Sequence, residues 1–520
     1  MKYIELFAGC GGLSLGLESE DFELFFANEL SPMAAETFAF NHLGKKLSNS
    51  DSDNVYWISS LFSREDLPRR LRENPYEATG LAGKYSDLHL LKEASKVDGS
   101  LLVGSIVDLN NYIDSNSWLL QKINTEEIDL ISGGPPCQSF SMAGLRQLSN
   151  QRNKLPWEFA KFVEKIKPKM VLLENVSGIL HAFEEEGKKF HAWFEVSKAF
   201  AEVGYIPLCL HVNAKYSGAA QNRPRFILIG FREDQFLSIF EKIKGNPLKK
   251  ALQKCHVFFN LIKNKKETSL NDLDFYDVIK NSDVFDNEIL SDLISYKDQA
   301  PVTAFDALDD LRQKGLPKSE YVNKINNTFK NKFSNKETLN HDYRCNSPLV
   351  MERFRVYQVI DKIDDKIASK EISSFIQSES ARDLSEDTFE KVKEFEFWEN
   401  NEWVIFDKKI EFENLLRKLH TKKRTQKALS ENRPAPAALS IPDDACHYHK
   451  NELRTLTVRE MARIQSFPDW FEFKSKVTTG GKMRKFEVPQ YTQVGNAVPP
   501  LLANALAKVI KKFLTVGKRV

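Results

Sequence analysis

The sequence predicts an α/β domain with a mostly parallel sheet, joined to a smaller and less regular second domain. Short apolar runs alternate with helical stretches over about the first 230 residues, which is the rhythm of a buried parallel sheet. Polar helical pieces rich in Lys, Asn and Glu follow from about 233 to 454. We therefore expect a large domain at 1–232, a second domain at 233–487 and a C-terminal segment, 488–520, that returns to the large domain.

Six apolar runs are expected to form the strands of the large domain. They are YIELFAG (3–9), ELFFANEL (23–30), LLVGSIVDL (101–109), IDLISGG (128–134), KMVLLENV (169–176) and RFILIGF (225–231). A polar insertion at about 44–99 interrupts this pattern, and we expect it to form excursions on the surface. After Pro499-Pro500, the segment LLANALAKVIKKFL has apolar residues at helical spacing, so a helix that packs against the sheet is predicted.

The composition is that of an ordinary soluble protein, which we expect to act in the cytoplasm. Hydrophobic residues make up 42% of the chain, and no apolar run approaches the roughly 18 to 20 residues that cross a bilayer. The six cysteines lie far apart without a CxxC pair, which disfavours a disulfide framework or a zinc ribbon. Cys446-His447-Tyr448-His449 is interpreted as a polar surface turn rather than a metal site. A net charge of +2 means that a nucleic-acid partner requires basic residues gathered on one face.

A glycine-rich turn after the first strand predicts a nucleoside site. Ala8-Gly9-Cys10-Gly11-Gly12 separates this strand from the helical stretch LSLGLE, and such a turn lets a ligand approach the backbone. Glu29 ends the second strand, where a carboxylate can accept both ribose hydroxyls, and Phe7 can lie against an adenine ring. The turn lacks the triphosphate-binding pattern GxxxxGK[ST]. Tight packing alone, with Glu29 as a capping acid, is the alternative explanation.

Cys137 stands at the tip of a second turn and is the candidate nucleophile. Gly133, Gly134, Pro135 and Pro136 lead the strand into this turn, which presents a thiol rather than burying it. A nucleophilic thiol needs a lowered pKa, which backbone N–H groups or a nearby Arg can provide. The alternative is a small buried cysteine.

Charged side chains are expected beside the same crevice. Glu174 ends the next strand and should face Cys137 across the carboxyl edge of the sheet. Arg223 and Arg225 in Gln221-Asn222-Arg223-Pro224-Arg225 place two guanidiniums there, suited to a base edge or a phosphate. One thiol, one carboxyl group and two guanidiniums are thus predicted to converge.

Taken together, these motifs resemble those of the DNA (cytosine-5) methyltransferase family. Six blocks occur in the order of the family: FAGCGG (7–12), GGPPCQSFS (133–141), ENV (174–176), QNRPR (221–225), LTVREMARIQSFPD (456–469) and QVGNAVPP (493–500). The resemblance covers about 1–231 and 300–520. It implies a Rossmann-like, S-adenosylmethionine-dependent methyltransferase domain at 1–232 and a target-recognition domain at 233–487.

The resemblance also implies roles for individual residues. The catalytic residues are Cys137, Glu174, Arg223 and Arg225, with Cys137 attacking C6 of the cytosine and Glu174 contacting N3 and the exocyclic amine. The cofactor residues are Phe7, Ala8, Gly9, Gly11, Gly12, Glu29, Ile106, Pro136, Asn496 and Val498, and the DNA-binding residues are Gln138, Ser141 and Gln221; no metal is expected. One departure is Gly104-Ser105-Ile106, where the family usually has Gly-Asp-Ile; Ser105 can still accept a hydrogen bond, and Asp108 is not a safe substitute.

The activity that the resemblance implies is methylation of C5 of a specific cytosine in double-stranded DNA. The base must leave the helix to be reached, so the second domain is expected to clamp the duplex. We expect a monomeric prokaryotic or phage protein that works at the nucleoid within a restriction-modification system, its cognate endonuclease being a functional rather than a physical partner.

Two other functions remain as alternatives, and the roles of two segments of the second domain are undecided. The alternatives are a tRNA cytosine methyltransferase of the same family and a catalytically silent DNA-binding protein. The basic stretch Leu415 to Lys427 can contact phosphates or form a solvated helix face. Arg459 and Glu460 are as suited to the junction between the domains as to DNA.

Overall fold

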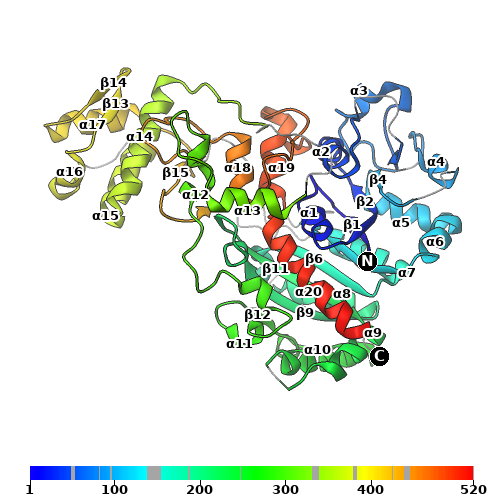
Figure 1. Ribbon diagram of the computed structural model, residues 1–520. Coiled ribbons are helices and arrows are strands. Elements are labelled where there is room, and N and C mark those ends of the chain that lie inside the picture. Colours follow the sequence, from blue (N-terminus) through cyan, green and yellow to red (C-terminus); the bar gives the residue numbers. More distant parts are fainter. Residues whose placement is uncertain are drawn as a thin grey trace.

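A nine-stranded sheet organises the larger part of the molecule (Figure 1). The computed structural model describes residues 1–47, 53–80, 82–93, 97–136, 154–185, 188–245, 247–330, 339–378, 383–423, 425–437 and 445–518. The strand order is β12-β9-β11-β6-β5-β1-β2-β4-β3. The strand bounds are β1 Lys2–Leu6, β2 Glu23–Glu29, β3 Val55–Trp57, β4 Ser100–Val103, β5 Ile128–Gly133, β6 Met170–Val176, β9 Tyr205–Asn213, β11 Pro224–Arg232 and β12 Phe275–Asp277.

The pairing confirms the predicted α/β fold with a mostly parallel sheet. Strand β1 lies between β2 and β5 and is parallel to both, and the pairs β5–β6, β2–β4 and β3–β4 are also parallel. Strand β11 runs antiparallel between β6 and β9. Because the carboxyl ends of the parallel strands share one edge, the turns that follow β1, β5 and β6 meet there. The antiparallel register adds the start of β11 to this edge, since Arg225 is paired with Val176.

Helices from distant parts of the chain cover the sheet. The helices of this domain are α1 Gly12–Glu18, α2 Pro32–Leu43, α3 Leu67–Arg70, α4 Leu88–Glu93, α5 Ile106–Ser115, α6 Ser117–Asn124, α7 Leu155–Ile166, α8 Ala192–Glu202, α9 Glu233–Lys242, α10 Pro247–Lys263, α11 Ser282–Phe285 and α20 Pro500–Lys518. The predicted C-terminal helix is α20, which extends across the sheet toward α9 and packs against α1 (Figure 1). This contact needs a glycine, because a Cβ at Gly16 would lie 2.3 Å from the Cβ of Ala503.

The segment that follows β11 packs with the large sheet. Strand β12 pairs with β9, and the apolar faces of α9 and α10 join the core of the large domain through residues such as Phe236 and Phe258. The sequence analysis assigned the residues from 233 onward to the second domain. In the structure, the chain stays with the large sheet until at least Leu293.

The polar insertion contributes to the sheet, so its prediction as surface excursions is wrong for part of it. Val55, Tyr56 and Trp57 form the short edge strand β3, are buried and pair with β4. Leu88 and Leu91 of α4 join the main core. Only a few apolar residues in a polar stretch make these contacts.

The second domain is mostly helical and lies to the left in Figure 1. Its helices, with those of the junction to the large domain, are α12 Ala304–Leu308, α13 Glu320–Thr328, α14 Pro348–Ile363, α15 Lys366–Gln377, α16 Glu386–Val392, α17 Lys409–Lys418, α18 Val458–Ile464 and α19 Gln490–Asn496. The short strands outside the main sheet are β7 Phe183–Glu185, β8 Lys188–Phe190, β10 Gln221–Asn222, β13 Phe397–Glu399, β14 Glu402–Val404, β15 Lys427–Ala428, β16 Ala435–Pro436 and β17 Ala445–Cys446. One core holds α14 to α17 together, and another joins α12, α13, α18 and α19 to the start of α1. None of the helices described is long and apolar enough to cross a membrane.

Candidate active site

The glycine turn after β1 is held by the carboxylate at the end of β2. The Gly9 N–H donates to Oε2 of Glu29 at 2.8 Å, and the Ser31 N–H donates to Oε1 at 2.7 Å. Burial raises the pKa of Glu29, while these two backbone donors oppose the rise. Positive φ angles of 55° at Phe7, 57° at Gly9 and 95° at Gly11 fold the turn back on itself. The turn and the acid that were predicted to bind a nucleoside are therefore in contact.

The C-terminal motif closes over this turn. A Cβ at Gly12 would lie 2.4 Å from the carbonyl oxygen of Val498, so the two segments touch through their backbones. Val498 is buried and Asn496 is exposed, while Ala8 is buried beneath the turn. Two segments about 490 residues apart in the sequence are thus in direct contact.

Gln493 anchors the C-terminal motif, a role that the sequence analysis missed. Its Oε1 accepts from the Thr37 hydroxyl at 2.6 Å, and its Nε2 donates to the carbonyl oxygen of Met33 at 3.2 Å. Both partners lie on α2, the helix that follows Glu29. The only sequence signal was the position of Gln493 inside QVGNAVPP, which does not specify a partner.

Glu5 supports the same turn from below and was also missed. The Ser14 hydroxyl of α1 donates to its carboxylate, and Glu5 is almost completely buried in β1. Burial raises the pKa of Glu5 to about 8, although the hydrogen bond from Ser14 opposes the rise. An acid within an apolar strand was the signal available in the sequence.

Glu174 lies against the turn that carries the predicted nucleophile. A Cβ at Gly134 would be 3.1 Å from Oε2 of Glu174, and Nδ2 of Asn175 donates to the carbonyl oxygen of Pro135 at 3.0 Å. The end of β6 and the Gly-Gly-Pro-Pro turn are therefore in direct contact. Pro136 is exposed, and Cys137, bonded to it, lies outside the described residues.

Arg225 completes a buried carboxylate–guanidinium pair. Its Nε lies 2.6 Å from Oε1 of Glu174, and the two side chains are only 9% and 11% exposed. Burial lowers the pKa of Arg225, and the charge of Glu174 counteracts this. Two of the predicted catalytic residues therefore meet beside the turn.

Arg223 points to a different partner. Its Nη2 donates to the carbonyl oxygens of Gly495 at 2.7 Å and Ala497 at 3.1 Å. Burial, and then the nearby charge of Arg225, hold its pKa well below the ordinary range. The guanidinium fastens the C-terminal motif to β11, so the structure gives Arg223 a positioning contact instead of an open face toward a base.

None of the three residues expected to bind DNA is exposed among the described residues. Gln221 is completely buried, and neither polar atom of its side chain has a hydrogen-bond partner among the described residues. In this conformation it is not open to a duplex. Gln138 and Ser141 lie outside the described residues.

The departure from the family pattern at Ser105 has a structural role. Its Oγ accepts from the Val107 N–H at 3.2 Å and caps α5, while Ile106 is buried in the main core. Asp108 accepts from the Gly80 N–H of the insertion at 2.8 Å. The Ser105 hydroxyl and the Asp108 carboxylate are therefore both engaged within the protein, and neither replaces the acid that the family usually has at the end of β4.

The basic stretch at 415–427 is partly used inside the second domain. Leu415 and Leu416 of α17 are buried, and Nζ of Lys418 pairs with Oε2 of Glu352 at 2.9 Å. Lys422 and Lys427 are exposed and keep the possibility of phosphate contacts. Arg417 of α17 packs over the Phe375 ring at 4.9 Å, so the helical part of the stretch uses its cations within the second domain.

Arg459 and Glu460 belong to the junction between the domains. Arg459 is fully buried and donates to the carbonyl oxygens of Leu339 and Pro468, each at 2.8 Å. Glu460 caps α18 and accepts two hydrogen bonds of 2.8 Å from Arg454. Burial acts to raise the pKa of Glu460, but its bonds to Arg454 lower it to about 2. Of the two roles that the sequence left open, the junction role is the one that these contacts support.

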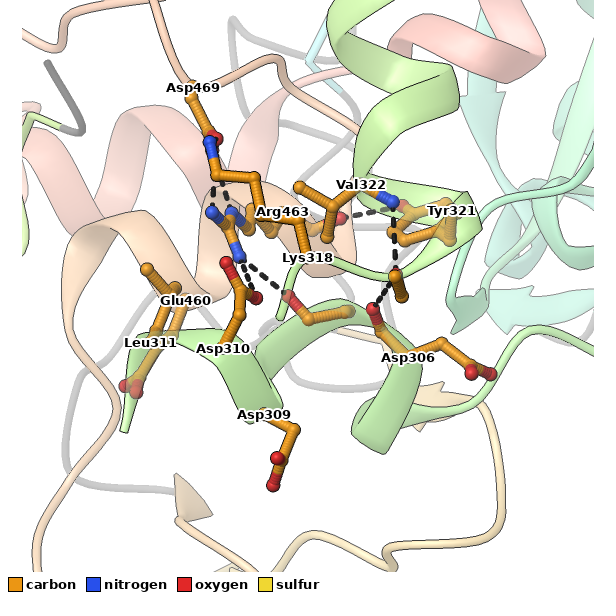
Figure 2. Close-up of polar contacts among 12 residues, drawn as sticks. Asp306, Asp309, Asp310, Leu311, Lys318, Tyr321, Val322, Glu460, Arg463 and Asp469 are labelled. Atoms are coloured by element: carbon orange, nitrogen blue, oxygen red, sulfur yellow. Dashed lines mark hydrogen bonds and ion pairs between the residues drawn. The ribbon is translucent and has the colours of Figure 1, made fainter. Parts of the chain in front are cut away.

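A neighbouring ion-pair network completes the junction (Figure 2). Arg463 reaches Asp310 at 2.5 Å and Asp469 at 2.7 Å, and Lys318 pairs with Asp469 at 2.8 Å. The Tyr321 hydroxyl donates to the carbonyl oxygen of Arg463 at 2.6 Å. The network ties the turn after α12 and the start of α13 to α18, the helices whose shared core reaches α1 of the large domain.

The segment from Cys446 to His449 is packed inside the second domain, so its interpretation as a surface turn is wrong. Cys446 and His447 are buried, and Nε2 of Gln358 donates to the carbonyl oxygens of His447 and His449, each at 2.9 Å. Burial lowers the pKa of His447 to about 3. Within the described part of the chain, no group of three or more His, Cys, Asp or Glu side chains is arranged to bind a metal.

Comparison with known proteins agrees with this geometry. A family model described as "C-5 cytosine-specific DNA methylase" matches residues 1–60 and 106–512, so that 61–105 lies outside the match. The Type II methyltransferase M.FnuDI of Fusobacterium nucleatum is 26% identical over 99% of this chain and 95% of its own length. The Type II methyltransferase M.Bpa9945I of Bacillus paralicheniformis is 26% identical over 99% of both chains. The crystal structure of the S. pombe Dnmt2 methyltransferase aligns over 99% of this chain and 98% of that chain, with 12% identity and a TM-score of 0.41.

Proposed function

Because the chain belongs to the C-5 cytosine-specific DNA methylase family, we propose that it methylates C5 of a specific cytosine in duplex DNA through a covalent bond from Cys137. The observation that supports this mechanism most is the contact between the Glu174–Arg225 pair and the turn that leads to Cys137. The proposed donor is S-adenosylmethionine, which supplies an electrophilic methyl group when bound. Glu29 and the turn from Phe7 to Gly12 would hold its nucleoside, closed in by Val498.

The proposed chemistry follows from the weak nucleophilicity of C5. The Cys137 thiolate adds to C6 of a cytosine turned out of the duplex, and electron density moves toward N3 and O2. A carboxyl group beside N3 and a guanidinium beside O2 stabilise that charge as it develops, roles that suit Glu174 and Arg225. C5 then takes the methyl group and loses its proton, and elimination of the thiolate restores the aromatic ring and the free enzyme.

Buried charges suit this task because they are fixed before the base arrives. Two backbone segments, the Gly-Gly-Pro-Pro turn and the start of β11, hold Glu174 and Arg225 in place, so the site needs little reorganisation on binding. Arg223 and Gln493 act indirectly, because they hold the C-terminal motif against the glycine turn. We assign them to positioning rather than to chemistry.

The relatives point to a biological setting. Since the similar proteins are named Type II methyltransferases, we propose that this chain is the modification enzyme of a restriction-modification system. It would act as a monomer at the nucleoid in the cytoplasm, and a cognate endonuclease would share its target sequence without binding to it.

Transfer of a labelled methyl group to duplex DNA tests the proposal. Full-length protein, labelled S-adenosylmethionine and genomic DNA lacking cytosine methylation should give labelled 5-methylcytosine at one recurring sequence, read by bisulfite sequencing. Cys137→Ala should abolish transfer, whereas Cys345→Ala, at an exposed cysteine, should retain it. Transfer to tRNA alone, or transfer by Cys137→Ala, would contradict the proposal.

A further inference from the structure

The insertion, which includes residues 61–105 outside the family match, lies where a nucleobase would be expected. In a doubly wound sheet the glycine turn follows the first strand, and the acid that takes the ribose ends the second. The next strand outward from β2 is β4, followed by β3 of the insertion. A base attached to that ribose would therefore lie at the end of β4, at Gly104 and Ser105.

A small cavity is present at this point, with the insertion as its outer wall. Leu30, Gly104 and Ser105 line one side, and Trp57, Glu73 and Thr79 line the other. Its volume is about 10 Å³, the space of about one water molecule. A cavity of this size has room for one polar group of a ligand.

Glu73 is the fixed acid in this wall. It is 7% exposed, and its Oε2 accepts from the Leu61 N–H at 2.8 Å and from the Ser60 hydroxyl at 3.0 Å. Both donors reach the same oxygen, and the Trp57 side chain lies near the same carboxylate, so the remaining acceptor capacity of Glu73 is next to the Trp57 ring. Burial raises the pKa of Glu73, while the hydrogen bonds from Leu61 and Ser60 oppose the rise.

Trp57 supplies a donor in the same wall. Its side chain is 2% exposed, and Nε1 lies near the Glu73 carboxylate but makes no aligned hydrogen bond with any described residue. The ring is held by Arg70, whose guanidinium carbon lies 5.2 Å from the ring centroid and which pairs with Asp87 at 2.7 Å. A buried N–H without a partner is costly, and an acceptor on a ligand would satisfy it.

We propose that Glu73 and Trp57 make the insertion the adenine-reading wall of the cofactor site. An acceptor beside a donor complements the edge of adenine, whose exocyclic amine donates and whose N1 accepts. Hypoxanthine presents the reverse pattern, since its O6 accepts and its N1 carries a proton. The inference rests on the proposed function, because it names residues that select the proposed donor.

Calorimetric titration of the full-length protein with two ligands tests this assignment. The ligands are S-adenosylhomocysteine and S-inosylhomocysteine, which differ only at the base edge. Wild type should bind the adenosyl compound at least about tenfold more tightly. Glu73→Gln should lose about tenfold in affinity for the adenosyl compound and most of the discrimination. Glu77→Gln, at an exposed acid of the same insertion, should bind like wild type.

A second variant separates recognition from folding. Trp57→Phe keeps the ring that Arg70 covers and removes only the donor, so it should reduce the discrimination about fivefold or more even if Glu73→Gln unfolds. The inference would be overturned if wild type bound both compounds equally well. It would also be overturned if folded Glu73→Gln and folded Trp57→Phe each kept the wild-type preference for the adenosyl compound. Binding of neither compound by wild type would instead contradict the proposed function itself.

Discussion

The Glu174–Arg225 pair gives the most quantitative prediction. Two opposite charges about 4 Å apart at an effective dielectric constant of about 20 attract each other by about 4 kcal/mol. Both side chains are nine-tenths buried, so removing one partner leaves a charge without compensation. Glu174→Gln and Arg225→Gln should therefore each lower the free energy of unfolding by about 3 to 5 kcal/mol. Glu174→Gln should also slow methyl transfer by about 10² to 10⁴.

A double-mutant cycle checks this reasoning. Urea unfolding followed by tryptophan fluorescence gives the stability of wild type, both single variants and the double variant. The double variant should lose less than the sum of the single losses, with a coupling of about 2 kcal/mol or more. Additive losses would show that the two side chains do not stabilise each other, and the interpretation of the site as a preorganised pair would then be wrong.

Two further predictions concern Glu5 and Arg223. Folding raises the pKa of Glu5 from 4.5 to about 8, so the folded protein binds the extra proton and its stability falls as pH rises between these values. The full fall is about 5 kcal/mol, and Glu5→Gln should flatten it in urea titrations at several pH values; an equal slope in both proteins would refute this. Arg223→Met should weaken S-adenosylhomocysteine binding about tenfold by releasing the C-terminal motif, while Arg232→Met, at the other end of β11, should not. Unchanged affinity with lost methyl transfer would place Arg223 at the base instead.

The sequence predicted the sheet because its strands carry their own signal. Runs such as MVLL at 170–173 in β6 are apolar throughout, as expected for strands covered on both faces. Edge strand β3 has only three residues, Val55–Trp57, in a polar stretch, so its sequence is too short to distinguish from a loop. The boundary near 233 was obscured because α9 and α10 are amphipathic and have polar outer faces, and such a pattern does not reveal which domain a helix covers.

The sequence predicted which residues belong to the candidate site better than it predicted which of them are in contact. Motif order brought Glu174, Arg225 and the turn before Cys137 to one edge, because strand ends in a parallel sheet converge. The direction of a long side chain depends on its tertiary neighbours, so the contact of Arg223 with Gly495 could not be read from QNRPR. Burial of Gln221 and the support from Gln493 depend on tertiary neighbours in the same way.

The most direct measurement of the central claim is the mass of a complex between this protein and duplex DNA containing 5-fluorocytosine at the target base. With S-adenosylmethionine present, fluorine cannot leave C5 as a proton does, so elimination is blocked and the bond to C6 persists. The account predicts a denaturation-resistant adduct whose peptide maps the attachment to Cys137, and none for Cys137→Ala. Methylation of ordinary target DNA without any such adduct, or an adduct at another residue, would contradict the account.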